Sequence, residues 1–263
     1  MLLTQPNETA YDLRFQLFGI PVRVHPFFWL LSFLMGFQAS QAWGEDGGGD
    51  ARIVILWVLA VFISILLHEM GHAVVIRMFG WSPNVTLYAF GGLASYDPQF
   101  TQARGSYRRG GNSHAGQIFI SFAGPLAGFL LALLICGGLL LANRTAFIEL
   151  IFTSYQLPGE PFENFHVFIF IQFLLFVNIL WGLVNLLPVY PLDGGRISRE
   201  LFLMADGRQG LRNSLMLSVA TGAGVAVLGL MNGQPFIGIM FGMLAYSSYQ
   251  QISGGGRFGG SPW

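Results

Sequence analysis

Charged residues are scarce in this chain. Only 10% of its 263 residues are charged and 53% are hydrophobic, whereas a water-soluble domain typically carries about 25% charged residues. The positive residues are 13 arginines with no lysine, they are balanced by 13 acidic residues, and they form no basic run. The composition therefore excludes an ordinary soluble domain and gives no support to nucleic-acid binding.

Cysteine is almost missing as well. Cys136 is the single cysteine, so an intrachain disulfide is excluded. The first residues lack a basic stretch followed by an apolar core, and we expect no cleaved signal peptide. Because no internal repeat is visible, we predict one domain over residues 1–252 and a flexible, glycine-rich tail over residues 253–263.

What the chain has instead is a series of long apolar runs. A spanning helix needs about 20 mainly apolar residues. We therefore predict an α-helical polytopic membrane protein with about six transmembrane helices and a small membrane-associated β-hairpin. The predicted spans cover residues 26–43, 52–79, 116–142, 166–187, 211–230 and 235–250.

Shorter patterns lie between these spans. FGIPVRVHP, at residues 18–26, has the alternation of a short strand that ends at proline. NVTLYAFGGLASYD predicts a β-hairpin or re-entrant strand pair around Gly91 and Gly92. AFIELIF, at residues 146–152, is expected to lie along the membrane interface or to prolong the third span, and residues 195–206 are helix-prone.

The arginines predict an orientation. With six spans, eleven of the 13 arginines fall on one side and only Arg52 and Arg144 on the other. Cytoplasmic loops carry the excess of positive residues. We expect an integral protein of the cell (inner) membrane with both termini in the cytoplasm.

The second span contains the sequence His68-Glu69-Met-Gly-His72. Histidines at positions i and i+4 of a helix share one face, where they can hold a zinc ion, and the glutamate between them is placed to act on water at the metal. Ionisable groups at membrane depth are costly and indicate function. The pattern points to hydrolysis inside a membrane.

A hydrolytic zinc site takes three protein ligands, so a third is needed. The remaining candidates are Asp193, Asp97, His25, His114 and His166. Asp193 is preferred because it follows the fourth span, on the side nearest the histidine pair, in a stiff segment punctuated by prolines and glycines. Irregular backbone at membrane depth requires protein or a water-filled cavity around it. The three histidines are interpreted as residues at span edges.

These motifs together resemble the site-2 protease family of intramembrane zinc metalloproteases. The resemblance rests on HEMGH in a span, on the later NLLPVYPLDGG, and on the Gly-Pro element FAGPLAG at residues 122–128, and it covers about residues 15–205. Gly128 stands where many members carry asparagine. No PDZ or CBS domain is visible, so the chain is similar to a minimal core member.

The resemblance implies a mechanism. One Zn²⁺ per chain is held by His68, His72 and Asp193, Glu69 moves the proton, and Asn185 donates its amide to the substrate backbone or the developing oxyanion. The implied substrate is a membrane-anchored protein whose transmembrane helix unwinds locally. The FGGLA segment at residues 90–94 pairs with it as an added strand. Substrate identity, regulators and oligomeric state are not indicated.

Other interpretations stay open. Asn185 can be a helix-end cap, Gly124 and Gly128 a helix-packing face, and FGGLA an ordinary hairpin turn. A CAAX-processing type of membrane peptidase would use a glutamate as third ligand, for which Glu200 is the only candidate. A non-catalytic scaffold that binds partner helices has no need of Glu69. A zinc transporter needs polar groups along several spans, and spans one, five and six offer almost none.

Overall fold

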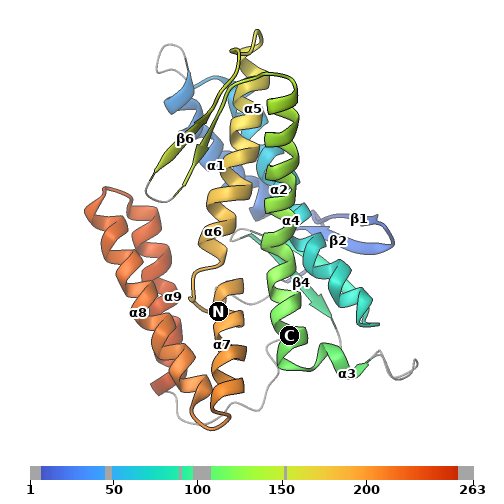
Figure 1. The fold of residues 1–263 in the computed structure, drawn as a ribbon, viewed down its shortest axis with the longest axis vertical. Helices are drawn as coiled ribbons and strands as arrows, with labels where there is room; N and C mark the ends of the chain where they lie inside the picture. The colour runs from blue at the N-terminus through green and yellow to red at the C-terminus, as the bar shows by residue number, and fades with distance from the viewer. Residues whose placement is uncertain (1–6, 45–48, 89–90, 97–107, 151–152, 254–263) are drawn as a thin grey trace. The chain divides into compact units, whose positions relative to one another are not determined.

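The computed structural model describes residues 7–44, 49–88, 91–96, 108–150 and 153–253. Most of these residues are helical, and Figure 1 labels most of the elements. The chain divides into two compact units. The first comprises Met1–Gln102 and Gly124–Gly182, and the second comprises Ala103–Ala123 and Leu183–Trp263. The single-domain interpretation stays a prediction.

A four-stranded sheet forms part of the first unit. Its strands are β1 (Leu13–Leu17), β2 (Ile20–Val24), β3 (Pro83–Tyr88) and β4 (Gly91–Tyr96), in the order β1-β2-β3-β4. β2 and β3 are parallel, and the other two pairs are antiparallel. The predicted strand before Pro26 and the predicted hairpin at Gly91 and Gly92 are both confirmed, although residues 89–90 lie outside the described chain.

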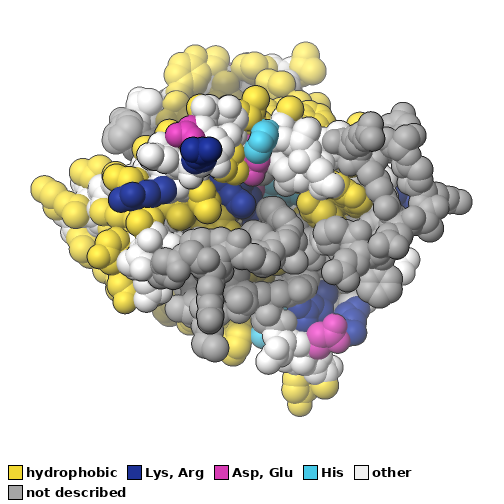
Figure 2. Space-filling view, turned by 90° about the horizontal axis from the view of Figure 1, so that it is seen from below, with side chains coloured by type: hydrophobic (Ala, Val, Ile, Leu, Met, Phe, Trp, Pro, Cys, Tyr) yellow, Lys and Arg dark blue, Asp and Glu magenta, His cyan; other side chains and the backbone are white. Residues whose placement is uncertain are grey.

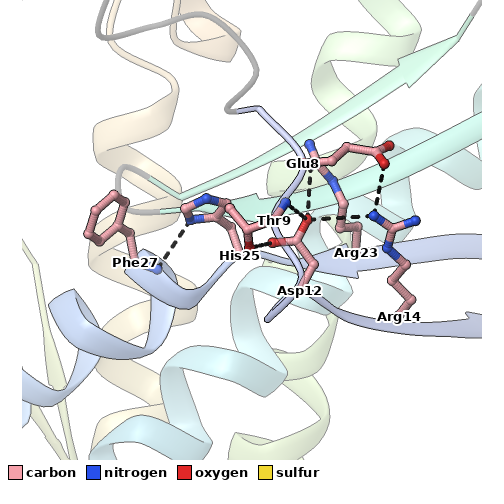
Figure 3. A network of polar contacts seen from close by, with 7 residues as sticks. All are labelled: Glu8, Thr9, Asp12, Arg14, Arg23, His25 and Phe27. Atoms are coloured by element: carbon pink, nitrogen blue, oxygen red, sulfur yellow. Dashed lines mark hydrogen bonds and ion pairs between the residues drawn. The ribbon is translucent and has the colours of Figure 1, made fainter.

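Polar contacts hold the start of this sheet. The carboxylate of Asp12 accepts hydrogen bonds from the hydroxyl of Thr9 (2.6 Å) and from Arg23 (3.2 Å), as Figure 3 shows. The hydrogen bond from Thr9 is the main cause that holds the pKa of Asp12 below its ordinary value. Arg14 donates a hydrogen bond to the exposed Glu8 and forms a longer ion pair with Asp12, at 3.9 Å. The network joins the segment before β1 to β2.

Three long helices lie entirely in the first unit. They are α1 (Pro26–Trp43), α2 (Ala51–Met78) and α5 (Phe165–Phe176), which continues as a π-helix, η1 (Val177–Trp181). Each begins at a side-chain cap, because His25, Asp50 and Asn164 accept hydrogen bonds from backbone amides of the first turn. α2 packs against both α1 and α5. α2 is thus held on two sides by its neighbours.

The segment after α4 (His114–Leu141) corrects one expectation. Residues 146–150 do not prolong this helix, their place at the membrane interface stays a prediction, and residues 151–152 lie outside the described chain. Instead β5 (Ala146–Glu149) pairs with β6 (Ser154–Leu157). The side chain of Gln172 bonds to both the amide and the carbonyl of Phe147. Because this amide satisfies the outer edge of β5, a strand is stable beside an apolar helix.

The second unit is helical in its described part. It contains α3 (Arg108–Gly111), the first part of α4, most of α6 (Gly182–Asn185), α7 (Asp193–Ala205), α8 (Gly210–Met231) and α9 (Pro235–Ser253). The predicted short helix is confirmed as α7. α8 and α9 approach closely through small residues: a Cβ on Gly222 would lie 3.1 Å from the Cβ of Ala245.

Four helices of the described chain are long and apolar enough to cross a membrane. They are α2, α4, the continuous helix Phe165–Asn185 and α8. The helices α1 and α9 form where the first and last spans are predicted, but they are not among the four. Both carry polar residues over their second halves, such as Gln38 and Gln41 in α1. Large hydrophobic areas on the face drawn in Figure 2 are exposed, as lipid-facing surfaces are.

Candidate metal centre

His68 and His72 lie on one face of α2. Their Nε2 atoms are 3.2 Å apart, and the ring planes meet at 75°. His72 is buried and His68 is half-buried. The helical spacing of four residues produces this arrangement, because side chains at i and i+4 lie one above the other. The predicted pairing of the two imidazoles is therefore present in the first unit.

The separation of the two nitrogens fits a shared zinc ion. Zinc binds imidazole nitrogen at about 2.0–2.1 Å with tetrahedral geometry, which places two such nitrogens about 3.3 Å apart. The observed 3.2 Å agrees with this value. Both rings present Nε2 to the same point, so the donor set suits a metal that prefers nitrogen ligands.

Gly124 of α4 allows a close approach to the histidine pair. A Cβ on Gly124 would lie 2.7 Å from Nε2 of His68 and would also overlap the ring of His72. Only glycine lets the helix backbone pass this close. The sequence indicated a packing face at Gly124 and Gly128. It did not indicate that Gly124 contacts the candidate ligands.

Glu69 is buried and lies against strand β4. Its side chain lies against Gly92 of β4, where a Cβ would be 2.5 Å from Oε1 of Glu69. Among the described residues β4 is the terminal strand of its sheet, so its outer edge faces away from β3. The hairpin that the sequence predicts around Gly91 and Gly92 therefore lies beside the candidate catalytic carboxylate.

A buried asparagine contacts the same helix one turn before His68. The side-chain amide of Asn178, in η1, donates to Oγ of Ser64 and to the carbonyl of Leu174, both at 2.8 Å. Gly128 makes room for it, because a Cβ there would be 3.2 Å from Oδ1 of Asn178. π-Helical turns often occur at functional sites. The sequence analysis missed Asn178, although an asparagine inside an apolar span is the signal that could have found it.

The second unit holds the segment that carries Asp193. Asp193 is buried and is the first residue of α7, and Asn185 is half-buried at the end of α6. Gly194 and Gly195 lie directly against the backbone of residues 186–190: a Cβ on Gly195 would be 2.5 Å from the amide nitrogen of Tyr190. The two glycines therefore let the start of α7 pack directly on the segment before it. The role of Asp193 as third ligand and the role of Asn185 stay predictions.

The other candidate ligands are engaged at helix ends. Nδ1 of His25 accepts a hydrogen bond from the amide of Phe27, and His166 lies 3.6 Å from the carboxylate of Asp50. His114 lies 2.6 Å from Glu200. This contact engages the carboxylate that a CAAX-type ligand set would need. Asp97 lies outside the described residues.

Comparison with known proteins agrees with these features. The model of peptidase family M50 matches residues 56–229. A zinc metalloprotease of Methanocaldococcus jannaschii is 25% identical over 249 residues, which is 92% of this chain and 61% of that protein. Stage IV sporulation protein FB of Bacillus subtilis is 24% identical over 241 residues, 88% of this chain and 66% of its own length. The chain thus spans less than two thirds of each of these two relatives.

A solved structure has the same fold. The site-2 protease from Methanocaldococcus jannaschii aligns with a TM-score of 0.54 at 22% identity, covering 92% of this chain and 95% of that one. The family match covers residues 68–72, Gly124 and Asp193. The predicted resemblance to site-2 proteases is confirmed, and this chain belongs to peptidase family M50.

Proposed function

We propose that this protein is an intramembrane zinc metalloprotease that hydrolyses a peptide bond within or near a transmembrane segment of a membrane-anchored protein. One observation carries the proposal. His68 and His72 place their Nε2 atoms 3.2 Å apart beside a buried Glu69, on a helix that is long and apolar enough to cross a membrane. Burying a carboxylate and two imidazoles in an apolar helix costs free energy, so these residues at membrane depth indicate a function.

The proposed metal site holds one zinc ion through His68, His72 and Asp193. A carboxylate completes a two-histidine set of the kind used in hydrolytic zinc sites and leaves one position open. The relatives named as zinc metalloproteases support the choice of metal. When bound, zinc lowers the pKa of water and polarises the scissile carbonyl.

Glu69 is the proposed proton carrier. Its carboxylate accepts a proton from the attacking water and passes it to the departing amine, so the same group acts first as base and then as acid. Asn185 donates its side-chain amide to the substrate backbone or to the oxyanion as it develops. Gly92 leaves room for the side chain of Glu69 here, because a Cβ on Gly92 would overlap it.

The substrate is proposed to bind as an added strand. A peptide bond in a helix is shielded, so the substrate helix must unwind before it can be cut. The outer edge of β4 offers backbone groups for an extended segment. Because Gly92 of β4 lies against Glu69, a segment paired with β4 passes the catalytic carboxylate.

The protein is proposed to lie in the cell (inner) membrane. It crosses this membrane six times, and both termini are in the cytoplasm. Four apolar helices support part of it, and α1 and α9 supply the other two spans. Eleven of 13 arginines then lie on the cytoplasmic side.

Glu69→Gln tests the proposed chemistry. The purified variant and the wild type are each reconstituted with a set of tagged single-span proteins, and cleavage and zinc content are measured together. We expect zinc to be retained and cleavage to fall by about 10²- to 10⁴-fold, the usual contribution of a general base.

Glu200→Gln is the control, because Glu200 is paired with His114 and has no part in the proposed chemistry. Undiminished cleavage by Glu69→Gln would contradict the proposal. If the wild type binds zinc and the tagged proteins but cleaves none of them, the non-catalytic scaffold that binds partner helices is favoured. Loss of zinc in Glu200→Gln but not in Asp193→Ala favours the CAAX-type peptidase.

A further inference from the structure

We infer that Ser218 of α8, backed by Ser248 of α9, is a positioning residue for the carboxylate of Asp193. The inference rests on the proposed function, since it takes Asp193 as the third zinc ligand. All the residues concerned belong to the second unit. The evidence is a pair of hydrogen bonds that joins the segment before α7 to two other helices.

The first bond leaves the Asp193 segment at Tyr190. The amide of Tyr190 donates to Oγ of Ser218 at 2.8 Å. Within residues 188–192 the amides of Val189 and Leu192 bond to carbonyls of their own segment, those of Leu187 and Val189. Pro188 and Pro191 have no amide hydrogen to give. The Tyr190 amide is therefore the backbone donor through which this stretch is fastened to α8.

The second bond fixes the acceptor. Oγ of Ser218 lies 2.8 Å from Oγ of Ser248, and the two serines are 1% and 0% exposed. The close packing at Gly222 and Ala245, one turn further along α8, holds the helices near enough for this contact. The hydroxyl of Ser218, buried between two apolar helices, keeps a defined orientation, because rotating away would leave a buried polar group without a hydrogen bond.

The stiffness of the segment carries the constraint to Asp193. Gly195 packs on the backbone of Tyr190 itself, with room for no Cβ, and Gly194 packs in the same way on residues 186–187. The start of α7 and the bonded amide therefore form one block. The hydrogen bond between Tyr190 and Ser218 therefore also fixes the position of Asp193 at the start of α7. Residues that orient metal ligands in this way tune affinity without touching the metal.

A serine on the same helix provides a matched control. Ser214 lies one turn before Ser218, is 4% exposed, and donates to the carbonyl of Leu211 in its own helix. Ser214→Ala and Ser218→Ala thus remove the same buried hydroxyl from neighbouring turns. Only the second removes the bond to the segment that carries Asp193.

The experiment measures two quantities in the full-length protein. The first is zinc affinity, by competition with a chelator. The second is amide hydrogen exchange over residues 188–192 in the metal-free protein. We expect Ser218→Ala to lower zinc affinity by about 10- to 100-fold and to speed exchange in this stretch, with Ser214→Ala near wild type in both. Ser218→Thr, which keeps the hydroxyl, should restore slow exchange, and Ser248→Ala should have a smaller effect than Ser218→Ala.

Ser218→Cys replaces Ser218→Ala if the alanine variant does not fold, since it keeps the volume and offers only a weak sulfur acceptor. Unchanged zinc affinity in a folded Ser218→Ala or Ser218→Cys, or an equal loss in Ser214→Ala, would overturn the inference. If the wild type bound no zinc, or if Asp193→Ala bound zinc as tightly as the wild type, the proposed ligand set would be refuted instead. The exchange of residues 188–192 would still report whether Ser218 holds the segment, so the two failures are distinguishable.

Discussion

Gly92 of β4 lies against the carboxylate of Glu69, so closely that a Cβ on the glycine would be 2.5 Å from Oε1. This contact joins the edge of a sheet to the helix that carries the histidine pair. It explains why a strand next to the site contains a glycine, a residue that otherwise weakens a strand.

Gly92→Ala is expected to displace Glu69 and leave the histidines in place. Cleavage should fall by at least about 10²-fold, as for loss of a general base, while zinc binding stays near wild type. Cleavage and zinc content measured on the same preparation check this. A variant that loses zinc and cleavage together would show that Gly92 supports the whole site and not Glu69 in particular.

Gly124→Ala is expected to act on the metal ligands. The new methyl group would meet Nε2 of His68 at 2.7 Å and the ring of His72, so we expect zinc affinity to fall at least about tenfold. Gly137→Ala is the control on the same helix, because a Cβ there meets nothing within 4 Å. Equal zinc affinity in the two variants would mean that α4 can move away from α2 at little cost.

Asn178→Ala is expected to destabilise the protein. It removes a buried bond to Ser64, and such bonds between membrane helices contribute about 0.6 kcal/mol on average and up to about 1.7 kcal/mol. Asn232→Ala is the matched control, since its amide also bonds to a carbonyl four residues earlier but is exposed. Thermal unfolding in detergent measures both. If Asn232→Ala lowered the thermal stability more than Asn178→Ala does, the stabilising role of the hydrogen bond between Asn178 and Ser64 would be contradicted.

The network at Asp12 predicts a dependence on pH. The Thr9 hydroxyl holds the pKa of Asp12 below its ordinary value of 3.8, so the charged form is favoured in the folded sheet. The stabilisation is complete above pH 3.8 and is lost as the pH falls through the lower folded value. Amide exchange of β1 and β2 should therefore accelerate in acid for the wild type and depend less on pH in Asp12→Asn.

Glu8→Gln is the control for that titration, because Glu8 is an exposed carboxylate of the same network. If Asp12→Asn and the wild type showed the same acid response, Asp12 would not be the group that couples this sheet to pH.

Much of the fold could be predicted from the sequence because its signals are local. Each of the six predicted spans coincides with a helix to within a few residues, since apolar runs bounded by capping residues such as Asp50 and Asn164 define them. The strand pair β5 and β6 was not predicted. Its stability depends on Gln172, which is distant in sequence and satisfies the backbone of Phe147.

The candidate site divides in the same way. His68, Glu69 and His72 could be found because a spacing of four residues fixes their common face. The parts that were missed depend on contacts between segments far apart in sequence: Gly124 against the histidines, Gly92 against Glu69 and Asn178 on Ser64. A glycine in a sequence shows that a side chain is absent, but not which neighbour uses the space.

Zinc content of the purified protein tests the central claim most directly, because it needs no knowledge of the substrate. The wild type is compared with His68→Ala, His72→Ala and Asp193→Ala, each shown to be folded by thermal unfolding. We predict about one zinc per chain in the wild type and its loss in all three variants, as expected when a site needs every ligand. A folded wild type without zinc would contradict the account, and zinc retained by Asp193→Ala would contradict the proposed ligand set.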